Sequence, residues 1–79
     1  MTSLSMATML DLKGLKCPLP ALKARKALKG LPPRAEVEVI CTDPMAAIDI
    51  PNLVRETGDV LVEQSRDESV LRFLIRRAA

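Results

Sequence analysis

The chain has 79 residues, of which 48% are hydrophobic and 28% charged, a composition typical of one small globular domain rather than of a disordered segment. The net charge of +2 is too balanced to indicate a nucleic-acid binder, and a single phenylalanine is too little aromatic surface for base stacking. No histidine is present, which excludes an imidazole general base and most zinc sites.

Residues 1–8 show no hydrophobic period, and we interpret them as a flexible lead-in to a single domain over residues 9–79. This lead-in has neither the basic start nor the apolar segment of a secretory signal peptide. No apolar run approaches the length of about 20 residues that a membrane helix needs. We therefore expect a cytoplasmic protein without a membrane partner, in which Cys17 and Cys41 stay reduced.

The first predicted elements are a strand and a helix. Residues 9–13 alternate between apolar and polar side chains and predict a short strand, which Gly14 ends. The spacing then predicts a helix over residues 18–29, with one apolar and one basic side. In this prediction Cys17 is the N-cap, and Pro18 takes the first helical position, where the N–H group that proline lacks would have no partner.

A second strand and helix follow in the same pattern. Residues 35–41 alternate and predict a strand. We predict a helix from Pro44 to about Thr57, with Asp43 as its N-cap and Gly58 after its end. Proline inside this helix, at position 51, is expected to kink or interrupt it.

The last two predicted strands are residues 59–64 and 70–77, joined by the polar turn 65–69. The element order is then strand–helix–strand–helix–strand–strand. Because crossovers between parallel strands are right-handed, both helices should lie on one face of a mixed four-stranded sheet. The sequence thus predicts a two-layer α/β sandwich whose other sheet face is open to solvent or to a partner.

Cys17 is the candidate reactive residue. A thiol at a helix N-cap lies near the positive end of the helix dipole and near unpaired N–H groups, and Lys13 and Lys16 add positive charge. These features predict a pKa of Cys17 below that of a free cysteine. Pro18 and Pro20 would make the helix tip rigid and exposed. The alternative interpretation is that Cys17 is an unreactive apolar residue at a strand–helix junction.

Four other polar or sulfur-bearing positions have two interpretations each. Cys41 lies on the same strand face as neighbouring valines, which indicates a buried core residue; the alternative is a resolving cysteine that forms a disulfide with Cys17. Arg25 and Lys26 form either a solvated helix face or a docking surface for an acidic partner. Asp49 is either a solvated helix residue or part of a partner-binding face.

One family resemblance covers most of the chain. The segment GLKCPLP, followed by a helix with Arg25 and Lys26, resembles the Cys-Pro-x-Pro signature of the TusA/SirA sulfur-carrier family, which includes YedF-like proteins. The similarity continues in order through Thr42-Asp43-Pro44, Asp49-Ile50-Pro51 and Arg72-Phe73-Leu74-Ile75-Arg76. It spans residues 9–77.

This resemblance implies a sulfurtransferase-type carrier rather than a multiple-turnover enzyme on a small substrate. Cys17 would accept sulfane sulfur as a persulfide from a cysteine desulfurase or a rhodanese-like donor. It would pass this sulfur to a DsrE-like or other acceptor protein, in tRNA thiolation, molybdenum-cofactor assembly or sulfur metabolism. The implied cargo is covalent sulfur, with no metal and no other cofactor.

Residues around Cys17 also receive predicted roles. The residues predicted to shape the site are Gly14, Lys16, Pro18, Pro20 and Asp43, and those predicted to take part in partner docking are Arg25, Lys26 and Asp49. Two other functions stay open at this point. One is a non-catalytic regulatory or protein-binding module, and the other is a thiol-redox protein that uses Cys17 and Cys41.

Overall fold

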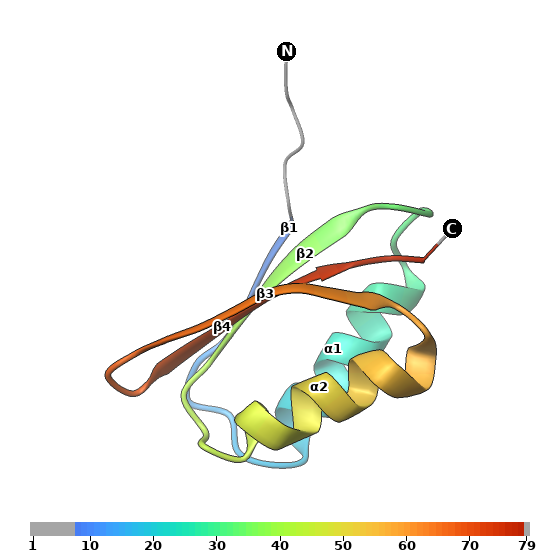
Figure 1. Ribbon diagram of the computed structural model, residues 1–79. Helices are drawn as coiled ribbons and strands as arrows, with labels where there is room; N and C mark the ends of the chain where they lie inside the picture. Colours follow the sequence, from blue (N-terminus) through green and yellow to red (C-terminus); the bar gives the residue numbers. More distant parts are fainter. Residues whose placement is uncertain (1–7, 79) are drawn as a thin grey trace.

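The computed structural model describes residues 8–78 as a four-stranded sheet with two helices on one face (Figure 1). This arrangement confirms the predicted two-layer α/β sandwich. The elements are β1 (Thr8–Leu12), α1 (Leu19–Lys29), β2 (Glu36–Cys41), α2 (Ala46–Thr57), β3 (Val60–Asp67) and β4 (Val70–Arg76). Thr8 already belongs to β1, and the rest of the predicted lead-in lies outside the described residues.

The sheet has the order β1-β2-β4-β3. β1 and β2 are parallel, whereas β4 is antiparallel to both of its neighbours, β2 and β3. The register pairs Leu12 with Cys41, the last residues of the two parallel strands. The loops that follow β1 and β2 therefore leave the same edge of the sheet.

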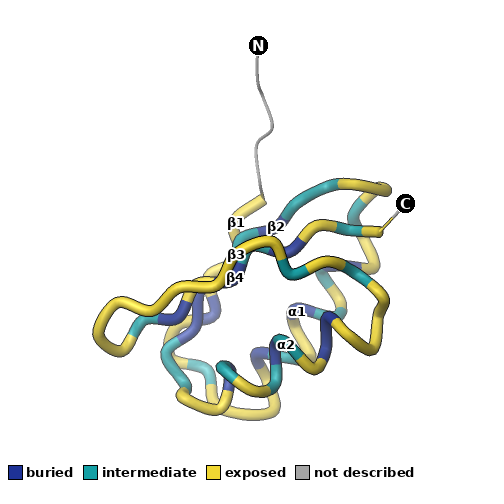
Figure 2. Tube along the Cα trace, viewed as in Figure 1, coloured by how far each residue is buried: buried dark blue, intermediate teal, exposed yellow. Residues whose placement is uncertain are grey.

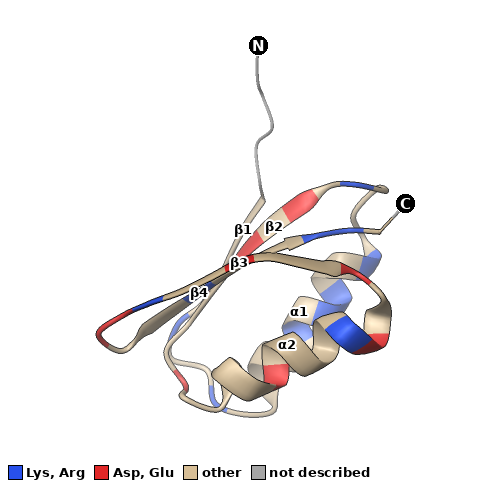
Figure 3. Ribbon diagram, viewed as in Figure 1, with Lys and Arg blue, Asp and Glu red and all other residues tan. Residues whose placement is uncertain are grey.

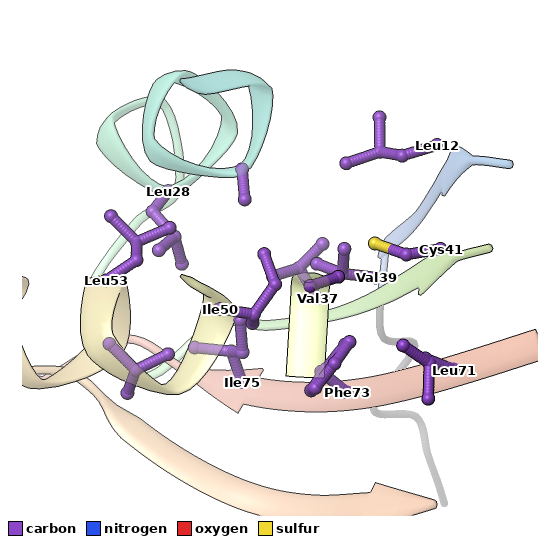
Figure 4. Packing of buried hydrophobic residues seen from close by; sticks show 13 residues of the cluster. Leu12, Leu28, Val37, Val39, Cys41, Ile50, Leu53, Leu71, Phe73 and Ile75 are labelled. Atoms are coloured by element: carbon purple, nitrogen blue, oxygen red, sulfur yellow. The ribbon is translucent and has the colours of Figure 1, made fainter. Parts of the chain in front are cut away.

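The core lies between the sheet and the helices (Figures 2 and 4). Alternate residues of the two central strands point into it because side chains along a strand alternate between faces. Fully buried members are Val37, Val39 and Cys41 from β2, Phe73 and Ile75 from β4, Leu28 from α1 and Ile50 from α2. Burial of this mostly aliphatic surface is the main favourable term that attaches both helices to the sheet.

The opposite face of the sheet carries charged residues of the central strands. Arg76 binds Glu36 across the strands at 3.1 Å, and Arg72 lies 3.6 Å from Glu38. Cross-strand pairs of opposite charge stabilise a sheet modestly, and the side chains of these pairs are partly exposed. They place charged side chains on the uncovered face of the sheet.

The second helix differs from its prediction in two ways. It begins at Ala46, not at Pro44, because Asp43 to Ala46 form a turn closed by the Ala46 N–H group. It is also continuous across Pro51, so the expected interruption is wrong. An interior proline costs about 3 kcal/mol, but burial of each large aliphatic side chain contributes about 1.5–3 kcal/mol. Ile50, Leu53 and Val54 are all buried on the same helix, which offsets that cost.

The two last strands form the predicted hairpin, but the turn is shorter than predicted. β3 continues to Asp67, so Glu68 and Ser69 alone connect it to β4, in place of the turn over 65–69. Glu68 adopts a φ of 56°, and positive φ values in a two-residue turn match the right-handed twist of the strands. The polar composition of residues 65–67 hid this part of the strand.

The first prediction concerns the core. Replacement of Phe73, which is 0% exposed, by alanine should lower the free energy of unfolding by about 3–5 kcal/mol. Ile75→Val should cost about 0.5–1.5 kcal/mol, and Val62→Ala, at an exposed site, less than about 0.5 kcal/mol. Urea unfolding followed by circular dichroism measures all three. Equal losses at Phe73 and Val62 would contradict the described core.

Candidate functional site

Cys17 lies in a turn between β1 and α1, with an exposed and free thiol. The Leu19 N–H group donates to the Lys16 carbonyl at 2.9 Å, which closes the turn around Cys17 and Pro18, and the Cys17–Pro18 peptide bond is cis. α1 begins at Leu19 with Pro18 as its N-cap. The prediction that Cys17 caps the helix is therefore wrong, although the thiol does lie beside the first helical turn.

The loop that carries Cys17 is held by the loop that follows β2. The Gly14 N–H group donates to Thr42 Oγ1 at 2.9 Å, and Gly14 itself takes a φ of 86°, which favours glycine. Asp43 accepts from the Cys17 N–H group through one carboxylate oxygen and from the Met45 N–H group through the other. Asp43 thus connects the cysteine loop to the start of α2.

The thiol itself is hydrogen-bonded to the second helix. Cys17 Sγ donates to Asp49 Oδ2 at 3.0 Å, and Asp49 is half-buried in the first turn of α2. This hydrogen bond, followed by slight desolvation and the negative charges of Asp49 and Asp43, raises the pKa of Cys17 above its usual range. The expected lowering of that pKa is wrong.

The helix terminus and the lysines do not offset these carboxylates. The Leu19 N–H group is already bonded to a carbonyl, and Pro20 has no N–H group, so the first turn of α1 has few free donors. Lys13 lies 3.9 Å from Asp11, and the positive charge of Lys16 helps to lower the pKa of Asp43. The positive charges of Lys13 and Lys16 therefore act mainly on Asp11 and Asp43 rather than on the thiol.

Cys17 opens into a groove of about 310 Å³ between α1 and α2. The groove is lined by Cys17, Pro18, Ala21, Leu22, Arg25, Asp49, Asn52, Leu53 and Glu56. Arg25 forms an ion pair with Glu56 at 2.8 Å, and this pair connects the two helices. Of the three residues assigned to docking, Arg25 and Asp49 line the groove with Cys17, whereas Lys26 is exposed on α1 and is not among the lining residues.

Several groove residues on α2 were not predicted. Asn52, Leu53 and Glu56 follow Asp49 at intervals of three, four and seven residues, which is the spacing of one helix face. This spacing can be recognised in the sequence, but it does not show that this face of α2 lies next to α1 and the thiol. Figure 3 shows basic residues along α1 and an acidic position early in α2.

Cys41 is buried in the core at 0% exposure, as the strand pattern predicted. Burial, followed by the charge of Asp43, raises the pKa of the Cys41 thiol to about 11. Such a thiol is a poor nucleophile near neutral pH, because the thiolate is the reactive form. This environment disfavours a resolving role for Cys41.

Among residues 8–78, no group of three or more histidine, cysteine, aspartate or glutamate residues has a geometry that could hold a metal ion. Neither α1 nor α2 is long and apolar enough to cross a membrane.

The family model described as "Sulfurtransferase TusA" matches residues 8–77. The chain is 36% identical over 69 residues to a protein named "Sulfur carrier protein TusA" from Allochromatium vinosum, covering 87% of this chain and 91% of that one. The chain belongs to the TusA family of sulfur carriers. It is also 40% identical to a "Putative sulfur carrier protein" from Archaeoglobus fulgidus, over 84% of this chain and 87% of the relative.

A solved structure of a SirA-like protein from Desulfitobacterium hafniense has the same fold as this TusA-family chain. The TM-score is 0.79 at 23% sequence identity, and the match covers 91% of this chain and 99% of the other. The family resemblance that the Cys-Pro-x-Pro segment indicated is thus confirmed in sequence and in fold.

The second prediction concerns Asp43. Hydrogen bonds from the Cys17 and Met45 N–H groups, and then the charge of Lys16, lower the pKa of Asp43 below its usual range. A group whose pKa is lower in the folded state contributes stability above its unfolded pKa and loses it as pH falls. The melting temperature should therefore fall as the pH drops below about 4, and Asp43→Asn should remove part of this dependence. Asp67→Asn, in the hairpin, is the matched control; equal changes in both variants would contradict this role.

The third prediction concerns Asp49. Because its carboxylate accepts the thiol proton in a hydrogen bond, Asp49→Asn should lower the pKa of Cys17 and raise the rate of alkylation by neutral iodoacetamide near pH 7.5. The pH profile of alkylation, read by intact mass, measures this shift. Asp67→Asn removes a carboxylate at the hairpin, outside this groove, and should leave the profile nearly unchanged. A profile that moves to higher pH in Asp49→Asn would refute the assignment.

Proposed function

We propose that this chain carries sulfane sulfur as a persulfide on Cys17 and relays it between proteins. The observation that carries the proposal is an exposed, free thiol at the end of a groove, on a loop that backbone and side-chain hydrogen bonds hold in place. Membership of the sulfur-carrier family supports the same assignment. The chemistry requires one nucleophilic sulfur and access for another protein.

The transfer consists of one sulfur–sulfur exchange in each direction. During loading, the Cys17 thiolate attacks the terminal sulfur of a donor persulfide; the donor's sulfur–sulfur bond breaks, and the donor sulfur leaves as a thiolate. Cys17 then holds the sulfur as a persulfide. During delivery, an acceptor nucleophile attacks that terminal sulfur, and Cys17 leaves as the thiolate. No external oxidant or reductant enters either step.

The shape of the site suits a protein partner more than a small substrate. The groove is open, and Leu22 on its wall is 55% exposed, so an incoming loop would contact apolar surface beside the thiol. We propose a cysteine desulfurase or a rhodanese-like protein as the donor and a DsrE-like or similar protein as the acceptor. We place the exchange in the cytoplasm, where thiols stay reduced, with tRNA thiolation, molybdenum-cofactor assembly or sulfur metabolism as the process served.

The fourth prediction tests loading. The reduced full chain is incubated with a cysteine desulfurase and cysteine, and separately with a rhodanese and thiosulfate, and intact and peptide masses are measured. We expect a gain of one sulfur atom on the Cys17 peptide, removed by dithiothreitol and absent in Cys17→Ser. Cys41→Ala should still load, because Cys41 is buried and outside the groove.

The other outcomes of the loading experiment identify the alternatives. No gain of sulfur with either donor would indicate a protein-binding module in which Cys17 has no transfer role. A loss of two hydrogens, with the Cys17 and Cys41 peptides linked, would indicate a thiol-redox protein. Each of these results would overturn the carrier proposal.

A further inference from the structure

Negative charge dominates the immediate surroundings of Cys17. Asp49 Oδ2 lies 3.0 Å from Sγ, and Asp43 accepts a hydrogen bond from the Cys17 N–H group. Both carboxylates disfavour the thiolate. Arg25, the cationic residue on the wall of the groove, is paired with Glu56 at 2.8 Å.

The lysines of the cysteine loop do not balance this charge at the sulfur. Lys13 lies 3.9 Å from Asp11, outside the groove. Lys16 stabilises the ionised form of Asp43, so its charge acts on a carboxylate that already holds the loop. The reactive sulfur thus has a carboxylate oxygen as its direct polar neighbour, although the whole chain has a net charge of +2.

We propose that Asp49 determines which reaction partners Cys17 accepts: its carboxylate repels anionic partners and favours those that bring a positive charge to the sulfur. This inference rests on the proposed function, because it describes how the sulfur site distinguishes its donors and acceptors from small thiols. Asp49 is here a specificity-determining residue, and the sulfur chemistry itself belongs to Cys17.

The mechanism follows from where negative charge lies during transfer. Before loading, Cys17 must lose its proton to solvent, and the thiolate that forms lies next to the Asp49 carboxylate. A cationic side chain from the docked partner would take the place of the thiol proton beside Asp49 and stabilise this thiolate. During delivery, Cys17 leaves as the same thiolate, and a leaving thiolate of higher pKa departs more slowly. A loaded carrier would therefore keep its sulfur from anionic thiols in free solution and release it to a partner with a cation at the interface.

The expected size of the selection follows from Coulomb's law. Two unit charges about 4 Å apart in water interact by an energy equivalent to a factor of about five in rate. The Asp49 carboxylate should raise the reaction rate of Cys17 with cationic reagents and lower its reaction rate with anionic reagents. It should weaken at 1 M salt, where the Debye length is about 3 Å.

The fifth prediction uses charged thiol reagents on the reduced full chain, with no donor protein. Cys17 is labelled with a trimethylammonium-ethyl or a sulfonatoethyl methanethiosulfonate; the thiolate attacks the reagent sulfur, a mixed disulfide forms, and methanesulfinate leaves. Intact mass follows single labelling, since Cys41 is buried. The ratio of the two rates cancels the thiolate fraction, so a change in that ratio reports the local charge rather than the pKa of Cys17.

Asp49→Asn should reduce the preference for the cationic reagent by about fivefold or more relative to the wild-type chain. Asp67→Asn changes the net charge of the chain equally but lies at the hairpin turn, so its ratio should match that of the wild type. Far-ultraviolet circular dichroism of each variant shows whether it folds. If Asp49→Asn does not fold, the salt dependence of the wild-type chain takes its place, with loss of the cationic preference expected at 1 M salt.

An equal rate ratio in wild type and Asp49→Asn, or a wild-type ratio that salt does not change, would overturn this inference. The result is independent of sulfur loading. If the chain loads sulfur but shows no charge selection, the proposed function stands and the role of Asp49 is refuted. If the chain shows charge selection but loads no sulfur, the role of Asp49 stands and the carrier proposal is refuted.

Discussion

The parallel pairing of β1 and β2 is the constraint on which the site depends. Parallel strands end at the same edge of a sheet, and the register places Leu12 beside Cys41 there. The cysteine loop and the loop before α2 must then run side by side. Hydrogen bonds from Gly14 to Thr42 and from Cys17 to Asp43 connect these loops over 28 and 26 residues of sequence. Without that pairing, neither Asp43 nor Asp49 would lie near the thiol.

The core and the site are formed by different residues of this small chain. The buried aliphatic residues of the two helices and the central strands face each other across one layer, and Cys41 is part of it. The Cys17 sulfur lies outside this layer, in the loop between β1 and α1, where it borders the groove between the two helices and the Asp49 carboxylate. Residues that pack the core are thus separate from residues that set the properties of Cys17, even though Asp49 and Ile50 are neighbours on α2.

The acidic side chains near Cys17 make this site different from an ordinary helix N-terminus. A helix terminus alone predicts an activated thiolate, because helix N-termini attract negative charge. Here the first turn of α1 has few free N–H groups, and a direct hydrogen bond to Asp49 favours the neutral thiol. A short contact with a full charge outweighs a terminus whose donors are already used.

The sequence by itself determined the element order, the α/β layers, the buried position of Cys41 and the candidacy of Cys17, because hydrophobic period, glycines and prolines act locally. Two local predictions were wrong: the interruption at Pro51, because buried neighbours keep the helix continuous, and Cys17 as the N-cap of α1, because a turn over Cys17 and Pro18 makes Pro18 the N-cap. Only the tertiary structure decided the charge at the sulfur. Asp49 lies 32 residues from Cys17 in sequence, and no local pattern encodes a contact that the packing of α1 against α2 creates.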